Sequence, residues 1–429
     1  MSALAEVLAI PSREWGGAML KASLRYAVSA AGPVAVSAAH FIASLIFLRL
    51  LKAGEFGQFS FLLIVVPFCL SASGALLGAP AALTRGKDEA TAEAEILALQ
   101  KASLAVGAAA GLIVTLLMLS TSAPFGEAMA FGLYGAFFVL RSFARSRFNI
   151  QNRLVRVTAS DVVYAALLVG GLAALIVAGC LTMQNAAMVL AAAAALAFAP
   201  FGLGYFRELI RALGTEAFAR YRPMWLSVTR WSLLGVVLTE LTANAHAYSV
   251  TLLNGPKAFG LLALGALFMR PAALVLQALP DIDQPVMARR IAQGDVKGAL
   301  RAVYEFRTAA GAVLAATVLA SLVIVICFPH LFAAKGYDWP AVLIVVVMWI
   351  AITALRAART PDAVLLQAVG DYAGLARIGM WSCAVSLSVT LALLLLFGPL
   401  ASLGGVLAGE ILIVAMIFPR TAAWRRQHG

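Results

Sequence analysis

The chain has 429 residues, of which 62% are hydrophobic and only 12% are charged, so its polar side chains cannot cover its apolar surface in water. This composition excludes a soluble globular fold, and the continuous Leu-, Ala- and Val-rich runs exclude the alternating strands of an outer-membrane barrel. The net charge of +12 could indicate nucleic-acid binding, but the excess of basic residues in the inner loops of membrane proteins accounts for it. We therefore expect an all-α polytopic membrane protein without a nucleic-acid partner.

Apolar runs of membrane-spanning length follow one another along the whole chain and predict twelve transmembrane helices. Residues 1–23 are expected to form a cytoplasmic or interfacial N-terminal segment. Spans 1–6 form a first lobe over 24–206, a basic cytoplasmic linker covers 207–225, and spans 7–12 form a second lobe over 226–429. The spans are predicted near 24–48, 57–82, 98–121, 127–148, 158–182, 186–205, 226–250, 258–280, 303–327, 339–361, 371–397 and 400–419.

The distribution of Lys and Arg tests this arrangement, because orientation follows the excess of positive residues in short loops. In the twelve-span arrangement 28 of the 32 Lys and Arg residues fall on one side. The other side holds Arg49, Lys52, Lys257 and Lys335. This split predicts a multi-pass protein of the cytoplasmic (inner) membrane with both termini in the cytoplasm.

A short charged seam between the first two spans is repeated in the second half. The chain turns at Gly54 and Gly57, and Phe56-Gly57 opens the second span. A degraded copy places Lys257 ahead of Phe259-Gly260 at the start of the eighth span, 203 residues later. This offset, close to half of the chain, suggests two similar halves.

Ionisable groups at membrane depth are costly and usually face a cavity or a partner, so they are the candidate functional residues. In the first half, Arg25 shares a face of span one with Ser29 and Gly32, although a snorkelling role is equally possible. Arg141 and Arg145 share a helix face, where they could bind phosphate or act as inside anchors. Asp161 lies near a membrane entrance.

In the second half, Arg230, Glu240 and Asn244 lie on one face of span seven, as expected of the wall of a watery cavity, and His246 points elsewhere. Arg270 and Glu410 are placed near the middles of spans eight and twelve. Arg356 shares a face with Arg359 near the cytoplasmic end and could bind phosphate or anchor the helix. Glu240, Arg270 and Glu410 could form structural ion pairs or a substrate-and-proton site.

Enzyme signatures are missing from the sequence, which contains no Walker sequence, HExxH or GxSxG. The predicted outer loops are too short to hold the acceptor of a polysaccharide polymerase or ligase. The cysteines occur singly, without metal-site spacing, and are interpreted as core residues. We therefore expect a protein that is not an enzyme and that uses no cofactor or metal.

The seam at Arg49 to Ser60, with Glu55-Phe56-Gly57 opening the second of twelve spans, resembles the polysaccharide transporter branch of the multidrug/oligosaccharidyl-lipid/polysaccharide exporter (MOP) superfamily. The resemblance implies two six-helix lobes around a central cavity that opens alternately to either side. In the flippases of that branch, a cationic cavity takes the diphosphate and sugars of an undecaprenyl-linked oligosaccharide. The resemblance further implies that Arg25 and Arg270 face the cavity. Arg49 is assigned to the outer gate.

The sequence differs in two features from other members of the superfamily, and these differences limit which members it resembles. The first span has no acid between Tyr26 and Leu48, where drug exporters of the superfamily often place one. The two additional terminal spans of the peptidoglycan-precursor flippases are absent, as is an acid beside Arg25. Both departures favour a flippase for a different glycolipid.

The first hypothesis is therefore a flippase for a lipid-diphosphate-linked oligosaccharide, with an undecaprenyl-diphosphate-linked glycan as substrate, membrane lipids around it and glycan-assembly proteins as possible partners. The predicted substrate ligands are Arg25, Arg141, Arg145, Arg230, Arg270 and Arg356. A cation-coupled exporter of drugs or small molecules is the alternative, with Glu240, Glu410 and Asp161 as coupling acids. A major-facilitator carrier and a membrane scaffold for glycan assembly are further alternatives.

Overall fold

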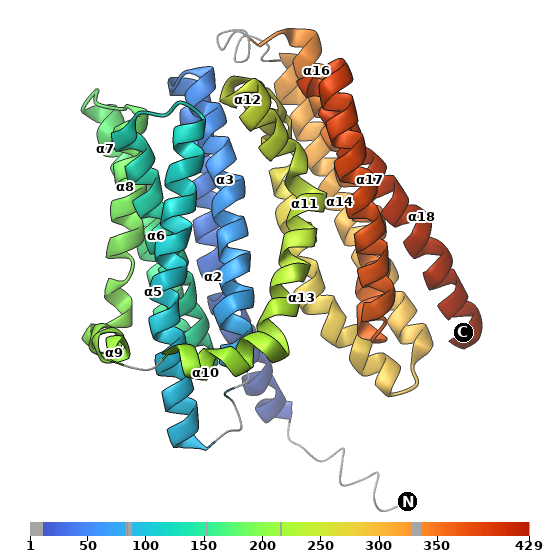
Figure 1. Ribbon diagram of the computed structural model, residues 1–429. Helices are drawn as coiled ribbons and strands as arrows, with labels where there is room; N and C mark the ends of the chain where they lie inside the picture. Colours follow the sequence, from blue (N-terminus) through green and yellow to red (C-terminus); the bar gives the residue numbers. More distant parts are fainter. Residues whose placement is uncertain are drawn as a thin grey trace, which may run out of the picture. The chain divides into compact units, whose positions relative to one another are not determined.

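Helices make up every regular element that the computed structural model describes (Figure 1). The expectation of an all-α protein is confirmed for this part of the chain. The helix through Arg25 is described, whereas the side chains of residues 12–30 are not. The described residues are 12–82, 84, 88–151, 153–214, 217–327 and 337–428.

Helical segments cover the predicted spans of the first half. Three of them, labelled η1 to η3, are short π- or 3-10-helical segments that continue or connect longer helices. The elements are α2 (Ser12–Leu50), α3 (Ala53–Ser73), η1 (Gly74–Gly78), α4 (Ala79–Ala82), α5 (Glu89–Ser120), α6 (Phe125–Ile150), α7 (Leu154–Val177), α8 (Met183–Leu196), η2 (Ala199–Phe201), α9 (Leu203–Leu213), α10 (Ala217–Met224) and η3 (Trp225–Thr229).

The second half contains fewer and longer helices. The predicted spans at 303–327, 339–361 and 371–397 each coincide with one continuous helix. The elements are α11 (Arg230–Asn254), α12 (Pro256–Phe268), α13 (Arg270–Ala292), α14 (Val296–Cys327), α16 (Trp339–Ala368), α17 (Tyr372–Phe397), η4 (Pro399–Ser402) and α18 (Leu403–His428).

Among the described residues, nine helices are long and apolar enough to cross a membrane, or ten if the bent pair α12 and α13 is one span. Helices α6 and α11 also occupy predicted spans but fall outside this set. Both carry charged side chains at membrane depth, such as Arg141 in α6 and Glu240 in α11, which lowers their mean hydropathy. The protein is a multi-pass membrane protein, and the count of twelve spans is not established by apolar length alone.

The eighth predicted span, 258–280, is not one continuous helix. Helices α12 and α13 meet at Met269 with a bend of 61°. Pro271 stands at the start of α13 and has no backbone N–H to continue the ladder of α12, so the helix is interrupted there. The break places Arg270 in the first turn of a new helix.

The chain forms two compact units. Unit 1 comprises residues 1–43, 69–119 and 123–232, and unit 2 comprises residues 44–68, 120–122 and 233–429. In unit 1, α6 packs against α7 and α8. In unit 2, α16 packs against α12, α13, α14 and α18, and therefore forms the centre of that unit.

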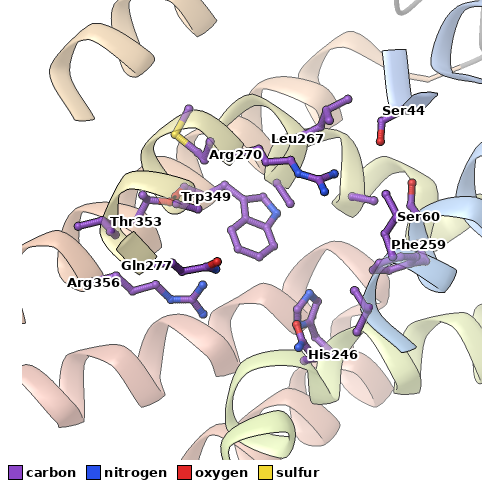
Figure 2. Close-up of a pocket in the computed structure, with 18 of the residues that line it drawn as sticks. Ser44, Ser60, His246, Phe259, Leu267, Arg270, Gln277, Trp349, Thr353 and Arg356 are labelled. Carbon is purple, nitrogen blue, oxygen red and sulfur yellow. Dashed lines mark hydrogen bonds between the residues drawn. The ribbon is translucent and has the colours of Figure 1, made fainter. Parts of the chain in front are cut away.

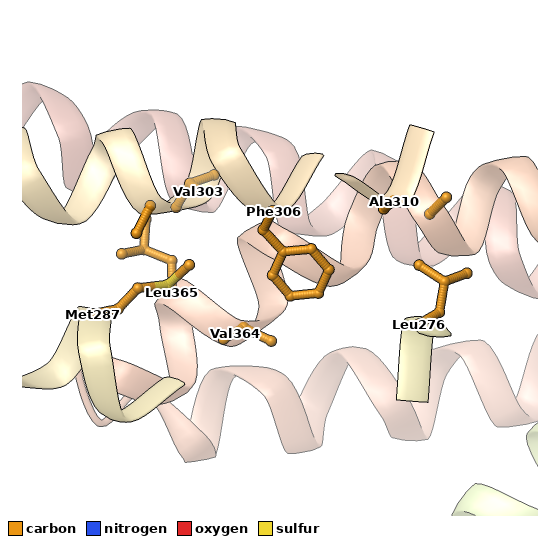
Figure 3. Packing of buried hydrophobic residues seen from close by; sticks show 9 residues of the cluster. Leu276, Met287, Val303, Phe306, Ala310, Val364 and Leu365 are labelled. Atoms are coloured by element: carbon orange, nitrogen blue, oxygen red, sulfur yellow. The ribbon is translucent and has the colours of Figure 1, made fainter. Parts of the chain in front are cut away.

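The apolar core of unit 2 joins α13, α14 and α16. Phe306 of α14 is almost fully buried and packs with Leu276 and Met287 of α13 and with Val364 and Leu365 of α16 (Figure 3). Burying one such large side chain contributes about 1.5–3 kcal/mol. This core fixes the segment of α16 that carries Arg356 and Arg359.

Candidate functional site

A cavity of about 360 Å³ lies within unit 2. Its walls come from α3, α11, α12, α13 and α16, and from Ser44 near the end of α2. The volume is at the lower end of the range of roughly 300–1,000 Å³ that ligand pockets occupy. The cavity is therefore large enough for a small polar group with part of its attached molecule.

The ionisable lining of this cavity is cationic. Arg270, Arg356 and Arg359 line it, and no carboxylate does so among the described residues. Figure 2 shows the guanidinium groups of Arg270 and Arg356 pointing into the pocket. Uncharged polar groups are contributed by Asn244 and Gln277, so the cavity offers hydrogen-bond donors to an anionic or polyhydroxyl ligand.

The bend at Met269 gives Arg270 its position. Because Arg270 starts α13, its side chain and the N-terminal end of a 23-residue helix lie at the same place on the cavity wall. The first turn of a helix has backbone N–H groups without intrahelical partners and carries a partial positive charge. Guanidinium and helix end therefore favour the same sign of ligand.

Arg356 and Arg359 share one carboxylate behind the cavity wall. Glu410 of α18 is buried and accepts hydrogen bonds from Nε of Arg356 at 2.7 Å and from Nε of Arg359 at 2.6 Å. The two arginine side chains are 29% and 24% exposed. Two guanidinium groups therefore share one carboxylate at this wall of the cavity.

Aromatic side chains form the apolar part of the lining. Trp349 lies on the cavity and donates its indole N–H to the carbonyl of Leu262 at 2.9 Å, which fixes the ring. His246 packs edge-on against this indole, with ring centroids 5.8 Å apart, and Phe259 lies on its other side. His246 is buried and lines the cavity, and its predicted position off the face of Glu240 and Asn244 stays a prediction.

The two copies of the Phe-Gly seam meet at one end of this cavity. Phe56 and Phe259 both line it, while Gly57 and Gly260 bring α3 and α12 into backbone contact. A Cβ added to Gly57 would lie 1.8 Å from the carbonyl oxygen of Pro256. No side chain can occupy that space, so both glycines are required for this close crossing.

Glu240 lies beside the cavity. It does not belong to the lining, but it accepts hydrogen bonds from Tyr248 Oη at 2.7 Å and from Asn244 Nδ2 at 3.1 Å. Asn244 does line the cavity, so the carboxylate is one hydrogen bond away from a lining side chain. Glu240 and Glu410 thus belong to different hydrogen-bond networks, with an amide and a phenol in one and two guanidinium groups in the other.

In unit 1, Arg141 and Arg145 bind a single acid. Asp161 of α7 is fully buried and lies 2.8 Å from Nη1 of Arg141 and 2.9 Å from Nη2 of Arg145. Arg141 is only 1% exposed, and its guanidinium lies over the rings of Phe138 and Tyr164. A ligand cannot reach Arg141 in this arrangement, and its role in substrate binding stays a prediction.

Helix α2 packs against this acid through its predicted polar face. A Cβ on Gly32 would lie 2.4 Å from Oδ2 of Asp161, so the helix backbone covers the carboxylate. About two turns further along α2, Nε2 of His40 lies 2.7 Å from the hydroxyl of Tyr164. The face that was predicted from helical spacing therefore meets a polar network, at least from Gly32 onward.

The remaining predicted residues do not meet at the cavity in the described structure. The side chain of Arg25 lies outside the described residues. Arg49 is exposed in the last turn of α2, and Arg230 lies over the ring of its neighbour Trp231 at 4.9 Å. Their assigned roles as substrate ligand and outer gate stay predictions.

Several residues of the cavity were missed in the sequence analysis. Trp349, Gln277 and Thr353 are among them, and they have no charge that distinguishes them from other residues of apolar spans. Trp349 lies seven residues before Arg356, on the same helix face, which is the signal that could have indicated it. Arg359 was singled out in the sequence only because its spacing places it on the same helix face as Arg356.

No protein-family model and no curated protein matches the sequence. Solved structures do match over most of the chain. A lipid II flippase MurJ in an inward closed conformation has a TM-score of 0.70 at 10% identity, covering 92% of this chain and 87% of that one. A multidrug resistance MATE family transporter of the MOP superfamily, inward-facing, has a TM-score of 0.60 at 11% identity, covering 91% and 96%.

The chain has the fold of MOP superfamily transporters. A further match is a MOP superfamily transporter from Pyrococcus furiosus, described by a reversed polarity of its binding pocket, with a TM-score of 0.52 at 12% identity over 94% of each chain. The resemblance drawn from the Phe-Gly seam is confirmed at the level of fold. Since both a flippase and drug exporters match, the fold does not distinguish between their substrates.

Proposed function

We propose that this protein is a flippase that moves a lipid-diphosphate-linked oligosaccharide across the cytoplasmic membrane by alternating access. The observation that carries the proposal is the cavity of unit 2, lined by Arg270, Arg356 and Arg359 without a carboxylate among its described residues. A diphosphate loses much of its hydration on entering a membrane protein, and fixed positive charge offsets that cost. A cationic drug would be repelled by the same lining.

The geometry of the arginines suits phosphate oxygens. Guanidinium groups donate parallel hydrogen bonds that match the spacing of two phosphate oxygens. Arg270 approaches from the start of α13, and Arg356 and Arg359 from one face of α16, so a diphosphate between them can contact both helices. The positive end of α13 adds a contribution of about 0.3–1 kcal/mol.

The uncharged lining is suited to a sugar. Trp349, His246 and Phe259 present aromatic surface, and Asn244 and Gln277 present amides. Apolar rings against the faces of a sugar, together with amides at its hydroxyl groups, would orient the residue next to the diphosphate. The volume of about 360 Å³ holds that end of the substrate, and the lipid tail would remain in the bilayer.

The structural neighbours support transport without chemical conversion. One is named a lipid II flippase, and others are MATE transporters of the MOP superfamily. By this proposal the chain is not an enzyme, its substrate is an undecaprenyl-diphosphate-linked glycan, and glycan-assembly proteins supply it. Both termini would face the cytoplasm, in agreement with the distribution of Lys and Arg.

Replacing Arg270 with Ala tests this function. The R270A protein, reconstituted in liposomes with a fluorescent lipid-diphosphate oligosaccharide, should translocate the substrate at least tenfold more slowly than wild type, because a charge-assisted contact of about 1.5–3 kcal/mol is lost. The matched control is R301A, since Arg301 is 78% exposed and pairs with Glu305 four residues along α14. Equal rates for R270A and R301A would overturn the proposal.

A cation-coupled exporter of small molecules is the second candidate, and the position of Glu240 favours it. The carboxylate lies one hydrogen bond behind the cavity-lining Asn244, where a proton or cation could couple to the cavity. Glu240→Gln should abolish drug efflux driven by a cation gradient if this candidate is right. Under the flippase proposal, E240Q translocates the lipid-linked oligosaccharide at the wild-type rate, and R270A does so at least tenfold more slowly.

A further inference from the structure

A second polar cluster surrounds Asp362, which lies three residues after Arg359 on α16. Asp362 of α16 is buried and is bound by Arg307 of α14 and by Nη2 of Arg425 of α18, the latter at 3.1 Å. Arg307 and Arg425 are 42% and 38% exposed and line a surface pocket of about 440 Å³. Two guanidinium groups against one carboxylate leave this pocket positive.

Two donors in this pocket have no hydrogen-bond partner among the described residues. They are the buried Oγ1 of Thr421 and Nε of Arg425, and both residues line the pocket. Thr421 differs in this from Thr317 and Thr353, whose hydroxyl groups donate to the carbonyl four residues earlier at 2.8 Å and 2.7 Å. A buried donor without a partner costs about 1–3 kcal/mol, so an acceptor that reaches both would be stabilised.

An exposed apolar stripe leads to the pocket. Ile411, Phe418 and Arg425 are spaced by seven residues and therefore lie on one face of α18. Ile411 is 52% exposed and Phe418 is 40% exposed, and Phe418 also lines the pocket. In a membrane-spanning helix such a stripe faces hydrocarbon, and it ends at an arginine.

We propose that Arg307, Thr421 and Arg425 form a binding site for the phosphate of an anionic phospholipid. The phosphate accepts from Oγ1 of Thr421 and from the arginine donors not used by Asp362, and one acyl chain lies along Phe418 and Ile411. Asp362 holds the two guanidinium groups and limits the site to a single excess charge, which suits a phosphodiester. The lipid is a resident of the leaflet on the side of the C-terminus and is distinct from the transported substrate.

The test is lipid-dependent thermal stability of the full-length protein in detergent, which requires no transport. Phosphatidylglycerol should raise the Tm of wild type with a saturable dependence on concentration. Thr421→Val keeps the shape and removes one donor, so about fivefold more lipid should be needed for half of the shift. Arg425→Gln should require at least tenfold more.

The controls separate the lipid from other phosphates and from general effects on folding. Thr317→Val removes a hydroxyl of the same kind from α14 and should respond to phosphatidylglycerol as wild type does. Inorganic phosphate and phosphatidylcholine should give at most a small shift, because the first has no acyl chain and the second carries a cation near the arginines. An unchanged response of T421V, or equal shifts with inorganic phosphate or phosphatidylcholine, would overturn the proposal.

Discussion

Two arginine pairs in this protein look alike in sequence and differ in what they can do. In unit 1, Arg141 and Arg145 of α6 bind Asp161, and in unit 2, Arg356 and Arg359 of α16 bind Glu410. Arg141 is 1% exposed and is covered by aromatic rings, whereas Arg356 is 29% exposed and lines a cavity.

The two pairs differ in how accessible their guanidinium groups are. The pair in unit 1 is closed by Gly32 of α2, which leaves no room above Asp161. The pair in unit 2 opens on a cavity that Arg270 also lines. Two arginines on one helix face are thus accessible to a ligand only where an open cavity accompanies them.

The largest effect is expected from removing the acid of the closed pair. Asp161→Asn leaves Arg141 buried without a counter-ion and should lower stability by about 3–5 kcal/mol. Thermal unfolding in detergent measures this as a strongly lowered Tm. Glu305→Gln is the control, because its pair with Arg301 is exposed and contributes less than about 1 kcal/mol. A wild-type Tm for D161N would mean that the closed pair does not hold unit 1 together.

The equivalent change in the open pair should cost less. Glu410→Gln keeps an oxygen for Arg356 and Arg359, and the two arginines are partly solvated, so we expect a loss of about 1–3 kcal/mol. The same change adds one positive charge to the cavity and should strengthen the binding of a lipid diphosphate several-fold. Unfolding and equilibrium binding of E410Q measure both effects. A larger loss of stability than in D161N would contradict the distinction between the pairs.

The close crossing of α3 and α12 beside the cavity can be tested by substituting its glycines. Gly57→Ala places a Cβ against the carbonyl of Pro256, which forces the helices apart and should destabilise unit 2 by about 1–3 kcal/mol. Gly54→Ala, three residues earlier in the same helix, meets no described atom within 4 Å and should be neutral or stabilising. Thermal unfolding of the two variants compares them, and equal Tm values would count against the close crossing.

The smallest effect concerns an acid–arginine pair at the surface. Asp371 caps α17 and is bound by Arg420, and the hydrogen bond from that guanidinium lowers the pKa of Asp371 below its ordinary value. Because the folded pKa lies below the unfolded one, the stabilisation is complete above the unfolded pKa of about 3.9 and is lost as the pH falls through the folded pKa. The two side chains are partly exposed, so less than about 1 kcal/mol is involved.

Unfolding of wild type and Asp371→Asn between neutral pH and pH 3 measures this contribution. The two proteins should differ most near neutral pH, and their difference should shrink at acidic pH. A difference that grows on acidification would contradict the lowered pKa.

Much of the fold follows from sequence alone. Continuous apolar runs predicted where helices lie, because no other structure satisfies the backbone in a bilayer. The break at Met269 was missed, because an arginine followed by proline inside an apolar run can either kink a helix or end it. That choice depends on packing against α16, which lies far away in the sequence.

The site was only partly predictable for the same reason. Helical spacing placed Arg356 with Arg359 and Arg141 with Arg145 on common faces, and the structure agrees. Their acids could not be assigned, since Asp161 and Glu410 lie on other helices. Glu240, Arg270 and Glu410 were grouped by depth, yet Glu240 binds Tyr248 and Glu410 binds α16.

The central claim is that the cavity of unit 2 binds an anionic lipid-linked group through its arginines. Equilibrium binding of undecaprenyl diphosphate to the purified full-length protein tests it most directly, with R270A compared with the exposed-site control R301A. We expect the Kd of R270A to rise by about ten- to a hundredfold and that of R301A to remain unchanged. An R270A protein that is folded and binds the lipid diphosphate with the wild-type Kd would contradict the account.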